Sequence, residues 1–389
     1  MNLQDLISDF NEAYGDSDHT IQIFFAPGRV NLIGEHTDYN AGKVFPMAID
    51  AGTYLLIRPN SSNTINFAST NFPLRSNIQI SKIKKIDGGA WINYPLGIIN
   101  EFLDLNVEIK GFDALYSGNI PPASGLSSSA SIEMVTAFAL NEMFNVGMDR
   151  MQMVHLSKKS ENEFIGVNCG IMDMFAVGFG KQNHAIAIDC ETLDYNYAPL
   201  DLKDYHFVVS NTNKERGLED SKYNERVEEC SKAVKRISKS KEIKNLSELS
   251  LKDFREIEHL FSNPLIKRRA YHVVSENYRV EESLKALKQN NLSLFGKLMN
   301  ASHVSLRDNY EVTGTELDTL VEASLKVDGV IGSRMTGAGF GGCTISLVNK
   351  ESLKRFYEQV GEEYNKKTGL NAEFHLFRPA DGVCEISRF

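Results

Sequence analysis

A short stretch near the start of the sequence concentrates side chains that could bind a polyhydroxylated ligand. Residues 26–40, APGRVNLIGEHTDYN, place Arg29, Glu35, His36 and Asp38 among turn-forming residues. Carboxylates accept hydrogen bonds from sugar hydroxyls, whereas Arg and His donate them. A polar surface loop is the alternative, but the stretch lies between apolar, strand-like runs, and charges buried there need partners. We therefore interpret it as a binding loop.

A second segment has the pattern of an anion site. Residues 121–134, PPASGLSSSASIEM, form a Gly/Ser-rich loop that leads directly into a predicted helix. The N-terminal end of a helix offers free backbone N–H groups and a positive dipole end, and phosphate is the obvious anion. A Ser N-cap on an ordinary helix explains the same letters equally well. The loop is not of the Walker A type, because no Lys-Ser/Thr pair follows its glycine.

A third segment, residues 333–348, is rich in glycine. Its sequence SRMTGAGFGGCTISLV contains a G-x-G-x-x-G match at Gly337, Gly339 and Gly342. A strand follows the match, whereas a dinucleotide-binding fingerprint opens a helix. We interpret the segment as a flexible loop that approaches a ligand with its backbone, although a tight turn is the simpler alternative.

Two acids stand in contrasting surroundings. Asp173 interrupts the apolar run CGIMDMFAVGF, where a carboxyl group is costly unless it is hydrogen-bonded, charge-paired or functional. Glu161 lies in the polar stretch SKKSENEF, which alone predicts a solvated helix face. The histidines outside the first segment show no metal-ligand spacing, so we read them as structural or surface residues.

The elements that position these segments indicate an α+β protein of two domains. A chain of 389 residues exceeds the size of one hydrophobic core. Strands and helices mix without regular βαβ alternation up to about residue 205, and charged amphipathic helices dominate afterwards. We expect domains at residues 1–205 and 206–389, and within the second a Gly-rich loop over 326–348 that ends in the strand CTISLV.

Composition narrows the class of protein. A formal net charge of -9 argues against a general polyanion binder. The five cysteines are an odd number without a C-x-x-C pair, which is typical of reduced thiols in the cytoplasm rather than of disulfides or a zinc site. The acidic N-terminal stretch has no apolar core, and no apolar run approaches the ~20 residues of a membrane helix, so we expect neither a secretory leader nor a span.

Together the three segments resemble the motifs of the GHMP small-molecule kinases. The first is similar to the signature of the galactokinase family, here residues 28–40. The similarity continues through residues 169–173, 222–226 and 303–308, so it extends over most of the chain. The second segment alone would indicate only a GHMP kinase, and the first segment narrows the resemblance to galactokinases.

The resemblance implies both a fold and a reaction. It implies an N-terminal domain like the second domain of ribosomal protein S5, a ferredoxin-like C-terminal domain, and an active site between them. It implies transfer of the γ-phosphate of ATP to the anomeric hydroxyl of α-D-galactose, giving α-D-galactose 1-phosphate and ADP. Mg²⁺ would accompany ATP, and the partners would be small molecules, with no nucleic acid, membrane or obligate protein partner.

The resemblance also implies roles for individual residues. Asp173 would be the catalytic base and Arg29 its partner, because a guanidinium favours the ionised form of a buried acid. Ser129 and Glu161 would hold Mg²⁺, which prefers a carboxylate, a hydroxyl and phosphate oxygens. The implied sugar contacts are Glu35, His36, Thr37, Asp38, Gly170 and Tyr223. The implied ATP contacts are Ser69, Ala123, Ser124, Gly125, Leu126, Ser127, Ser128 and Ser129.

The sequence departs from the family pattern at three positions. Met174 stands where many relatives have Gln, and Ser124 where Gly or Ala is common. Ala41 replaces a usual glycine, which predicts a slightly strained loop if the position needs a positive φ. Two alternatives therefore stay open beside a galactokinase: a kinase for a related sugar such as N-acetylgalactosamine or arabinose, and a non-catalytic sugar sensor on the same fold.

Overall fold

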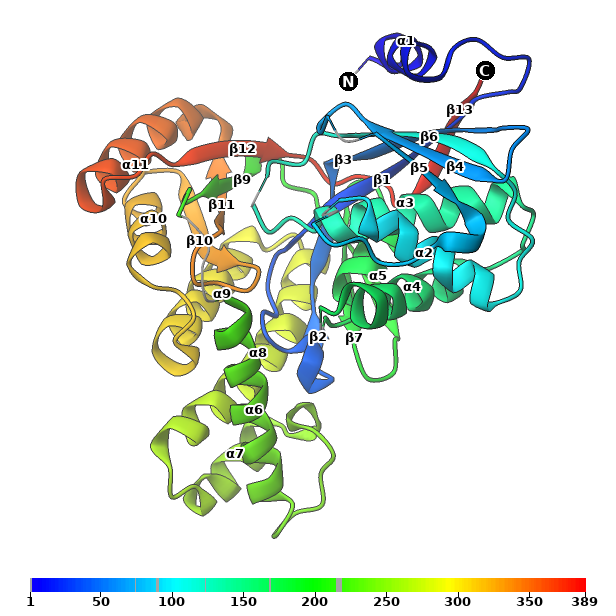
Figure 1. Cartoon of the computed structure of the whole chain (residues 1–389). Helices are drawn as coiled ribbons and strands as arrows, with labels where there is room; N and C mark the ends of the chain where they lie inside the picture. Colours follow the sequence, from blue (N-terminus) through cyan, green and yellow to red (C-terminus); the bar gives the residue numbers. More distant parts are fainter. Residues whose placement is uncertain (1, 74, 89–90, 123, 168, 215–218) are drawn as a thin grey trace.

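Two groups of strands, each with its own helices, dominate the structure, a computed structural model of the chain (Figure 1). It describes residues 2–73, 75–88, 91–122, 124–167, 169–214 and 219–389. In Figure 1 the larger sheet and both termini lie on the right, the smaller sheet lies on the left, and a helical extension points downward.

The larger sheet has the strand order β13-β1-β3-β6-β4-β5. All of its neighbouring strands are antiparallel except β4 and β6, which run parallel. Adjacent residues on β1 alternate between two cores: Phe24 faces the helix-covered core and Ile23 the core under α1. The strands are β1 Gln22–Asn31, β3 Pro46–Pro59, β4 Thr64–Ser69, β5 Ser76–Gln79, β6 Phe112–Gly118 and β13 Cys384–Arg388.

Helices cover both faces of this sheet. The amphipathic helix α1 packs Leu6 and Phe10 onto one face. The other face carries helices whose apolar residues, Ile99, Leu140 and Phe175 among them, form the largest core. The helices are α1 Leu3–Tyr14, α2 Asn93–Asp104, α3 Ser128–Met143, α4 Arg150–Lys159, the π-helical segment η3 Ser160–Ile165, and α5 Met172–Phe179.

The second sheet is antiparallel throughout, with the order β10-β11-β9-β12. It is buried on both faces, because Phe207 and Val209 of β9 face the core that contains α9, whereas Val208 faces the core with α10 and α11. The elements are β9 Tyr205–Asn211, β10 Val330–Thr336, β11 Cys343–Asn349, β12 Glu373–Phe377, α9 Leu292–Ser305, α10 Thr315–Leu325 and α11 Leu353–Thr368.

Helices and a small sheet complete the described chain. A third core, with Ile237, Phe254 and Tyr310, holds the helical extension together. The extension comprises α6 Glu219–Ile237, η4 Leu246–Glu248, α7 Leu251–Ile257, η5 Glu258–Leu260, α8 Pro264–Lys288 and the π-helical η6 Leu306–Tyr310. The remaining elements are η1 Asp38–Asn40, β2 Lys43–Val44, η2 Ile80–Lys82, β7 His184–Asp189, β8 Tyr195–Pro199 and η7 Lys350–Ser352.

The structure refines two expectations about the second domain. β9 begins at Tyr205, where the sequence placed the boundary, but β13 leaves the second part and pairs with β1 of the larger sheet. Residues 384–388 therefore belong to the first sheet. The expected loop over 326–348 is also partly wrong, because residues 330–336 form β10, which leaves only the short connections before β10 and before β11 irregular. Backbone pairing decides both cases, and the local sequence does not reveal it.

Candidate active site

A bidentate ion pair joins the first sheet to helix α5. Arg29 of β1 donates from Nε to Oδ1 and from Nη2 to Oδ2 of Asp173, both at 2.7 Å. A bulge between Pro27 and Gly28 precedes Arg29, and such bulges re-aim the following side chain. The side chain of Arg29 is 8% exposed and that of Asp173 27%, so the pair is open to solvent only on the side of the acid.

The Gly/Ser-rich loop packs directly against this pair. Arg29 Nη1 donates to Gly125 O at 2.7 Å, and its backbone N–H donates to Leu126 O at 3.1 Å. Ser127 donates its hydroxyl hydrogen to Asp173 Oδ2. Gly28 allows the close approach, since a Cβ there would lie 2.7 Å from Leu126 O. The loop is thereby held beside the acid at the start of α3, as expected for an anion site.

Two cavities meet at the ion pair. One, of about 300 Å³, lies between the Gly/Ser-rich loop and the third segment. The other, of about 430 Å³, is lined by the binding loop, by residues near α5 and by the start of α6. Both cavities share Arg29, Asp173, Tyr223, Gly337 and Ala338. The acid therefore stands where a ligand in one cavity would touch a ligand in the other.

The third segment closes the first cavity opposite the Gly/Ser-rich loop. Its turn between β10 and β11 has a run of residues with positive φ, from Gly337 to Gly342 with Ala338 as the exception. Glycine is required at Gly339, where φ is +83° and a Cβ would lie 2.2 Å from Val312 O. The expected flexible loop that offers its backbone is thus a tight, strongly constrained turn at the cavity wall.

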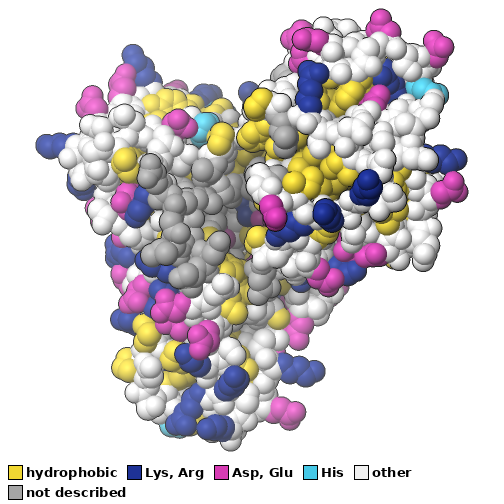
Figure 2. Space-filling model, in the orientation of Figure 1, with side chains coloured by type: hydrophobic (Ala, Val, Ile, Leu, Met, Phe, Trp, Pro, Cys, Tyr) yellow, Lys and Arg dark blue, Asp and Glu magenta, His cyan; other side chains and the backbone are white. Residues whose placement is uncertain are grey.

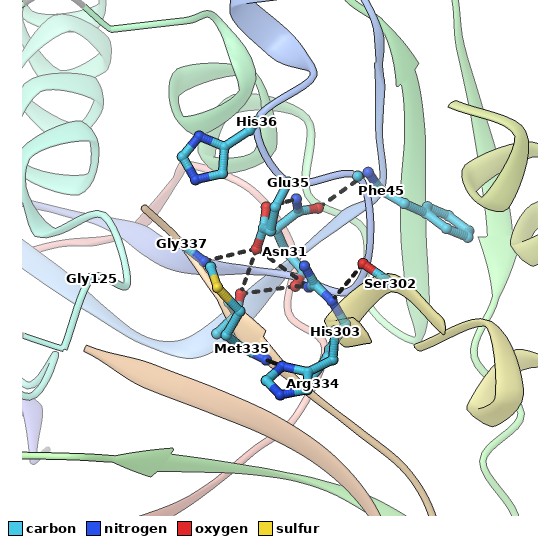
Figure 3. A network of polar contacts seen from close by, with 12 residues as sticks. Asn31, Glu35, His36, Phe45, Gly125, Ser302, His303, Arg334, Met335 and Gly337 are labelled. Carbon is cyan, nitrogen blue, oxygen red and sulfur yellow. Dashed lines mark hydrogen bonds and ion pairs between the residues drawn. The ribbon is translucent and has the colours of Figure 1, made fainter. Parts of the chain in front are cut away.

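Glu35 fastens the binding loop to β10, as Figure 3 shows. Its Oε1 accepts hydrogen bonds from Gly337 N at 2.7 Å, Thr336 Oγ1 at 3.0 Å and Arg334 Nη1 at 3.3 Å. Asn31 Nδ2 donates to the other oxygen, Oε2. An oxygen of a carboxylate has two lone pairs, so only Oε2 retains capacity for a ligand in the second cavity. Sequence reasoning assigned Glu35 to a ligand and missed this tie between the two sheets.

Asp38 and Gly170 form a tight contact in the second cavity. A Cβ on Gly170 would lie 2.0 Å from Asp38 Oδ2, so the carboxylate occupies the space of the missing side chain. Burial, with a smaller contribution from the charge of Asp173, raises the pKa of Asp38 to about 6. Tyr223 lines the same cavity, and its ring lies 5.7 Å from that of His36. Three of the predicted sugar contacts thus share one wall with His36.

A hydroxyl and a carboxylate lie side by side at the Gly/Ser-rich loop. The Ser129 hydroxyl hydrogen-bonds to Glu161, and Cys169 Sγ donates to Glu161 Oε2 at 3.2 Å. Burial and the charge of Asp173 raise the pKa of Glu161. Sequence context suggested a solvated helix face for this acid, which is wrong, because the residue is 6% exposed. The donor set fits a divalent cation that arrives with phosphate ligands of its own.

Several expected site residues do not reach a cavity. The Thr37 hydroxyl faces the loop itself, because Oγ1 lies 2.7 Å from Lys43 O and 2.8 Å from Gly34 O and can donate its one hydrogen to either. Ser69 lies at the end of β4 and accepts from Asn71 N at 3.1 Å, outside the linings of both cavities. Ala123 lies outside the described residues. The other predicted ATP contacts, Ser124, Gly125, Leu126, Ser127, Ser128 and Ser129, line the first cavity.

The departures from the family pattern have structural explanations. Ala41 adopts φ +54° in the left-handed region, so the expected strain is present. Met174 is fully buried in the main core, and Asp173, the acid before it, accepts a hydrogen bond from the Ser127 hydroxyl. Ser124 donates to Pro121 O at 2.6 Å, a contact within the loop.

The chain matches three family models and close relatives across its length. The models are the galactokinase galactose-binding signature over residues 8–59, the GHMP kinase N-terminal domain over 93–181 and the GHMP kinase C-terminal domain over 283–366. A galactokinase of Clostridium tetani is 49% identical, with 99% of this chain and 98% of that one covered. This chain belongs to the galactokinase family. It is therefore an enzyme of the sugar kinase class, and its predicted α+β GHMP kinase fold is confirmed.

Solved structures agree with the assignment to galactokinases. The galactokinase of Lactococcus lactis, solved with galactose, superposes with a TM-score of 0.95 at 45% identity and covers 99% of this chain and 100% of its own. A mevalonate kinase of Methanococcus jannaschii, at 24% identity and a TM-score of 0.69, shows the shared fold alone. Within the part of the galactokinase chain that the structure describes, every helix is too short or too polar to cross a membrane.

Proposed function

We propose that this galactokinase transfers the γ-phosphate of ATP to the anomeric hydroxyl of α-D-galactose, giving α-D-galactose 1-phosphate and ADP. The observation that carries the proposal is the Arg29–Asp173 pair at the junction of two cavities. One cavity borders an anion-binding loop and the other a set of sugar-type donors and acceptors. The galactose in the Lactococcus lactis relative supports the choice of sugar.

Asp173 is the proposed acceptor for the anomeric proton. Its two oxygens are oriented by Arg29 and Ser127, and 27% of its side chain is exposed toward the cavities. A sugar hydroxyl in the second cavity would donate to this carboxylate while its oxygen faces the first cavity. Phosphoryl transfer needs mainly such positioning and charge neutralisation, so orientation of the hydroxyl by Asp173 would already lower the barrier.

Arg29 is the proposed stabiliser of the transferred group. Each of its three nitrogens donates one hydrogen bond, two to Asp173 and one to Gly125 O, so the guanidinium group lies between the acid and the Gly/Ser-rich loop. Fixed positive charge at this place opposes the negative charge that develops between donor and acceptor oxygens. The N-terminal end of α3 adds backbone N–H groups on the nucleotide side.

Ser129 and Glu161 are the proposed protein ligands of Mg²⁺. A divalent cation is a general requirement of ATP-dependent kinases, and these two oxygen ligands already lie in hydrogen-bond contact, with Ser129 lining the first cavity and Glu161 the second. When bound with ATP, Mg²⁺ would neutralise phosphate oxygens. Two protein ligands are too few for a closed cage, so the remaining ligands must be phosphate and water.

The second cavity supports recognition of a hexose. Asp38 and Glu35 Oε2 offer acceptors, and His36 and Tyr223 line the same wall. We assign these residues and Gly170 to the sugar. A site that bonds the axial C4 hydroxyl leaves buried groups unpaired when that hydroxyl is equatorial, so glucose should be rejected strongly.

An aromatic pair that sequence reasoning missed is our proposal for the adenine end of ATP. Phe72 is 52% exposed and stacks on Trp91, with ring centroids 6.4 Å apart and planes at 12°. Asn71, the residue before Phe72, donates from Nδ2 to Gly118 O at 2.9 Å. This bond holds the segment with Phe72 at the end of β6, just ahead of the Gly/Ser-rich loop. Trp91 is the one tryptophan of the sequence, so nucleotide titration followed by fluorescence tests the assignment directly.

We also propose the domain division and the location. Residues 1–205 and 206–383 would form the two domains, with 384–388 returning to the first sheet. The five cysteines are all free, which favours the reducing cytoplasm.

The test is a coupled ADP-release assay with a panel of galactose, glucose, N-acetylgalactosamine and arabinose. We expect activity with galactose, much weaker kcat/KM with the others, and a sugar 1-phosphate product by phosphorus NMR. Asp173→Asn is the negative control, because the amide keeps the shape of the side chain and removes the negative charge of the proton acceptor. Comparable kcat/KM for glucose and galactose contradicts the sugar assignment, and galactose binding without turnover identifies a sensor.

A further inference from the structure

His36 has both ring nitrogens in hydrogen bonds, and their partners determine where its proton lies. Nε2 lies 3.1 Å from Ala338 O, and Nδ1 lies 2.9 Å from the hydroxyl of Tyr39. A carbonyl oxygen can only accept, so Nε2 must carry the hydrogen. The ring is 5% exposed, and burial lowers the pKa of His36 to about 3, so the imidazole is neutral. Nδ1 is therefore an acceptor, and Tyr39 donates to it.

The direction of this bond fixes the next two. The Tyr39 hydrogen is used on His36, so Tyr310, whose oxygen lies 2.8 Å away, must donate to Tyr39. The Tyr310 hydrogen is then used as well, and the Cys230 thiol at 3.1 Å donates to Tyr310. Tyr310 is 0% exposed and Cys230 1%, so water does not compete for these groups. The chain of donors runs from α6 through η6 and the binding loop to the third segment.

We propose that Tyr39 is a positioning residue that fixes His36 as an Nε2–H donor at the border of the two cavities, with Tyr310 and Cys230 orienting Tyr39. Ala338 lines both cavities, and His36 lines the sugar side. A sugar oxygen can receive a hydrogen bond from His36 only at Nε2, in competition with Ala338 O. The same proton thus connects sugar binding to the turn that borders the nucleotide cavity.

The inference rests on the proposed function for the identity of the sugar, but the tautomer can be measured without any substrate. Protein labelled with ¹⁵N-histidine, assigned with the His36→Gln variant, reports the protonation of each ring nitrogen by NMR. Near neutral pH we expect His36 with a bare Nδ1 and a protonated Nε2. A proton on Nδ1 of the wild-type protein overturns the proposal, whether or not any variant folds.

The variant Tyr39→Phe removes the donor while keeping the ring. It leaves the buried Nδ1 unsatisfied, so we expect a mixture of His36 tautomers and an increase of about tenfold in the galactose KM. Tyr310→Phe should cause a smaller increase, because Tyr39 can still donate to His36. The KM for ATP in Tyr39→Phe, measured at saturating galactose, should stay close to the wild-type value.

A matched control comes from a tyrosine in the second sheet region. Tyr364 is 0% exposed, whereas Tyr39 is partly exposed, and Tyr364 donates to Thr212 O at 2.7 Å, outside both cavity linings. Tyr364→Phe loses a buried tyrosine hydrogen bond that is remote from both cavities, and it should lower the melting temperature without changing the galactose KM. An unchanged tautomer and an unchanged galactose KM in folded Tyr39→Phe contradict the proposal. If no sugar is phosphorylated, the proposed function fails, while the NMR result still decides the role of Tyr39.

Discussion

The Arg29–Asp173 pair allows a quantitative test of the proposed chemistry. Its two hydrogen bonds are 2.7 Å long, and the side chains are 8% and 27% exposed. Removing one partner of a buried pair costs about 3–5 kcal/mol, because the other charge is left unpaired. The exposure of Asp173 places this pair at the low end, at about 3 kcal/mol, which corresponds to about two orders of magnitude in an equilibrium or rate constant.

The kcat of each single variant should fall by more than the factor that the loss of this ion pair alone accounts for. Asp173→Ala removes a proton acceptor, a group that typically contributes about 10²–10⁴ in rate. Arg29→Ala removes charge stabilisation worth about 10²–10³, and it also releases the acid from its orientation. Independent effects would multiply to a loss of about 10⁴–10⁷ in the double variant. Because one residue acts through the other, we expect the double variant to resemble the poorer single variant, with a coupling of about 3–4 kcal/mol, the equivalent of the smaller single loss.

The assay is kcat by coupled ADP release, with circular dichroism and melting temperature as folding controls. Arg58 and Asp113 form a second buried pair, at 3.1 Å between Nη2 and Oδ2, which lines neither cavity. The corresponding single and double variants of Arg58 and Asp113 should have lower melting temperatures, and the kcat of the folded protein should be unchanged. Additive losses for Arg29 and Asp173 would refute the paired mechanism. A near-normal kcat in Asp173→Ala would remove the base assignment altogether.

Four further outcomes follow from contacts within and near the cavities. Burial raises the pKa of Asp38 to about 6, so an acceptor role requires pH above this value: the galactose KM should rise as pH falls through about 6 in wild type, but not in Asp38→Asn. Gly170→Ala pushes a methyl group against Asp38 Oδ2, 2.0 Å from the ideal Cβ, and should raise the galactose KM about 10–100-fold with ATP binding unchanged by calorimetry. Burial raises the pKa of Glu133 well above its ordinary value, so the folded protein is most stable at low pH, where this carboxyl group is protonated, and loses stability as the pH rises. Glutamine does not titrate, so the melting temperature of Glu133→Gln should increase relative to that of the wild type with increasing pH. Chelation should abolish activity, and Glu161→Gln should raise the Mg²⁺ concentration for half-activation and weaken Mn²⁺–nucleotide binding measured by electron paramagnetic resonance.

Local patterns in the sequence predicted the elements that carry the site. The Gly/Ser-rich loop predicted the start of α3, and α1 has the same kind of local signal, the helical spacing of Leu6 and Phe10. Both depend on neighbours three or four residues apart, so the sequence contains their full signal. The sequence did not predict β13 and β10, because each strand is defined by pairing with another strand and not by its local sequence. Their pairing is long-range, and short strands have weak intrinsic preferences.

Within the candidate site, residue type could be predicted more reliably than contact. Asp173 was singled out because an acid in an apolar run needs a partner, and the structure supplies Arg29. Glu161 received the opposite interpretation from equally local evidence. Its burial arises from η3, a π-helical segment that follows α4 and turns the residue inward, and a sequence window does not register this change of helical pitch. Thr37 shows the opposite case: it was predicted to contact the sugar, but its hydroxyl hydrogen-bonds within the binding loop.

The arrangement of charges explains why the site cannot be separated from the contact between the two sheets. Glu35 accepts three hydrogen bonds from β10 and the following turn, and Arg334, its cationic partner, is 0% exposed. Burying such a pair costs several kcal/mol of desolvation per ion, which hydrophobic residues of similar volume would avoid. Hydrophobic residues could not provide a carboxylate that lines the second cavity while its Oε1 accepts from Gly337 N. The binding loop and the turn after β10 are therefore set relative to each other by a carboxylate that also lines the second cavity, and a substitution at Arg334 should disturb sugar affinity and interface stability together.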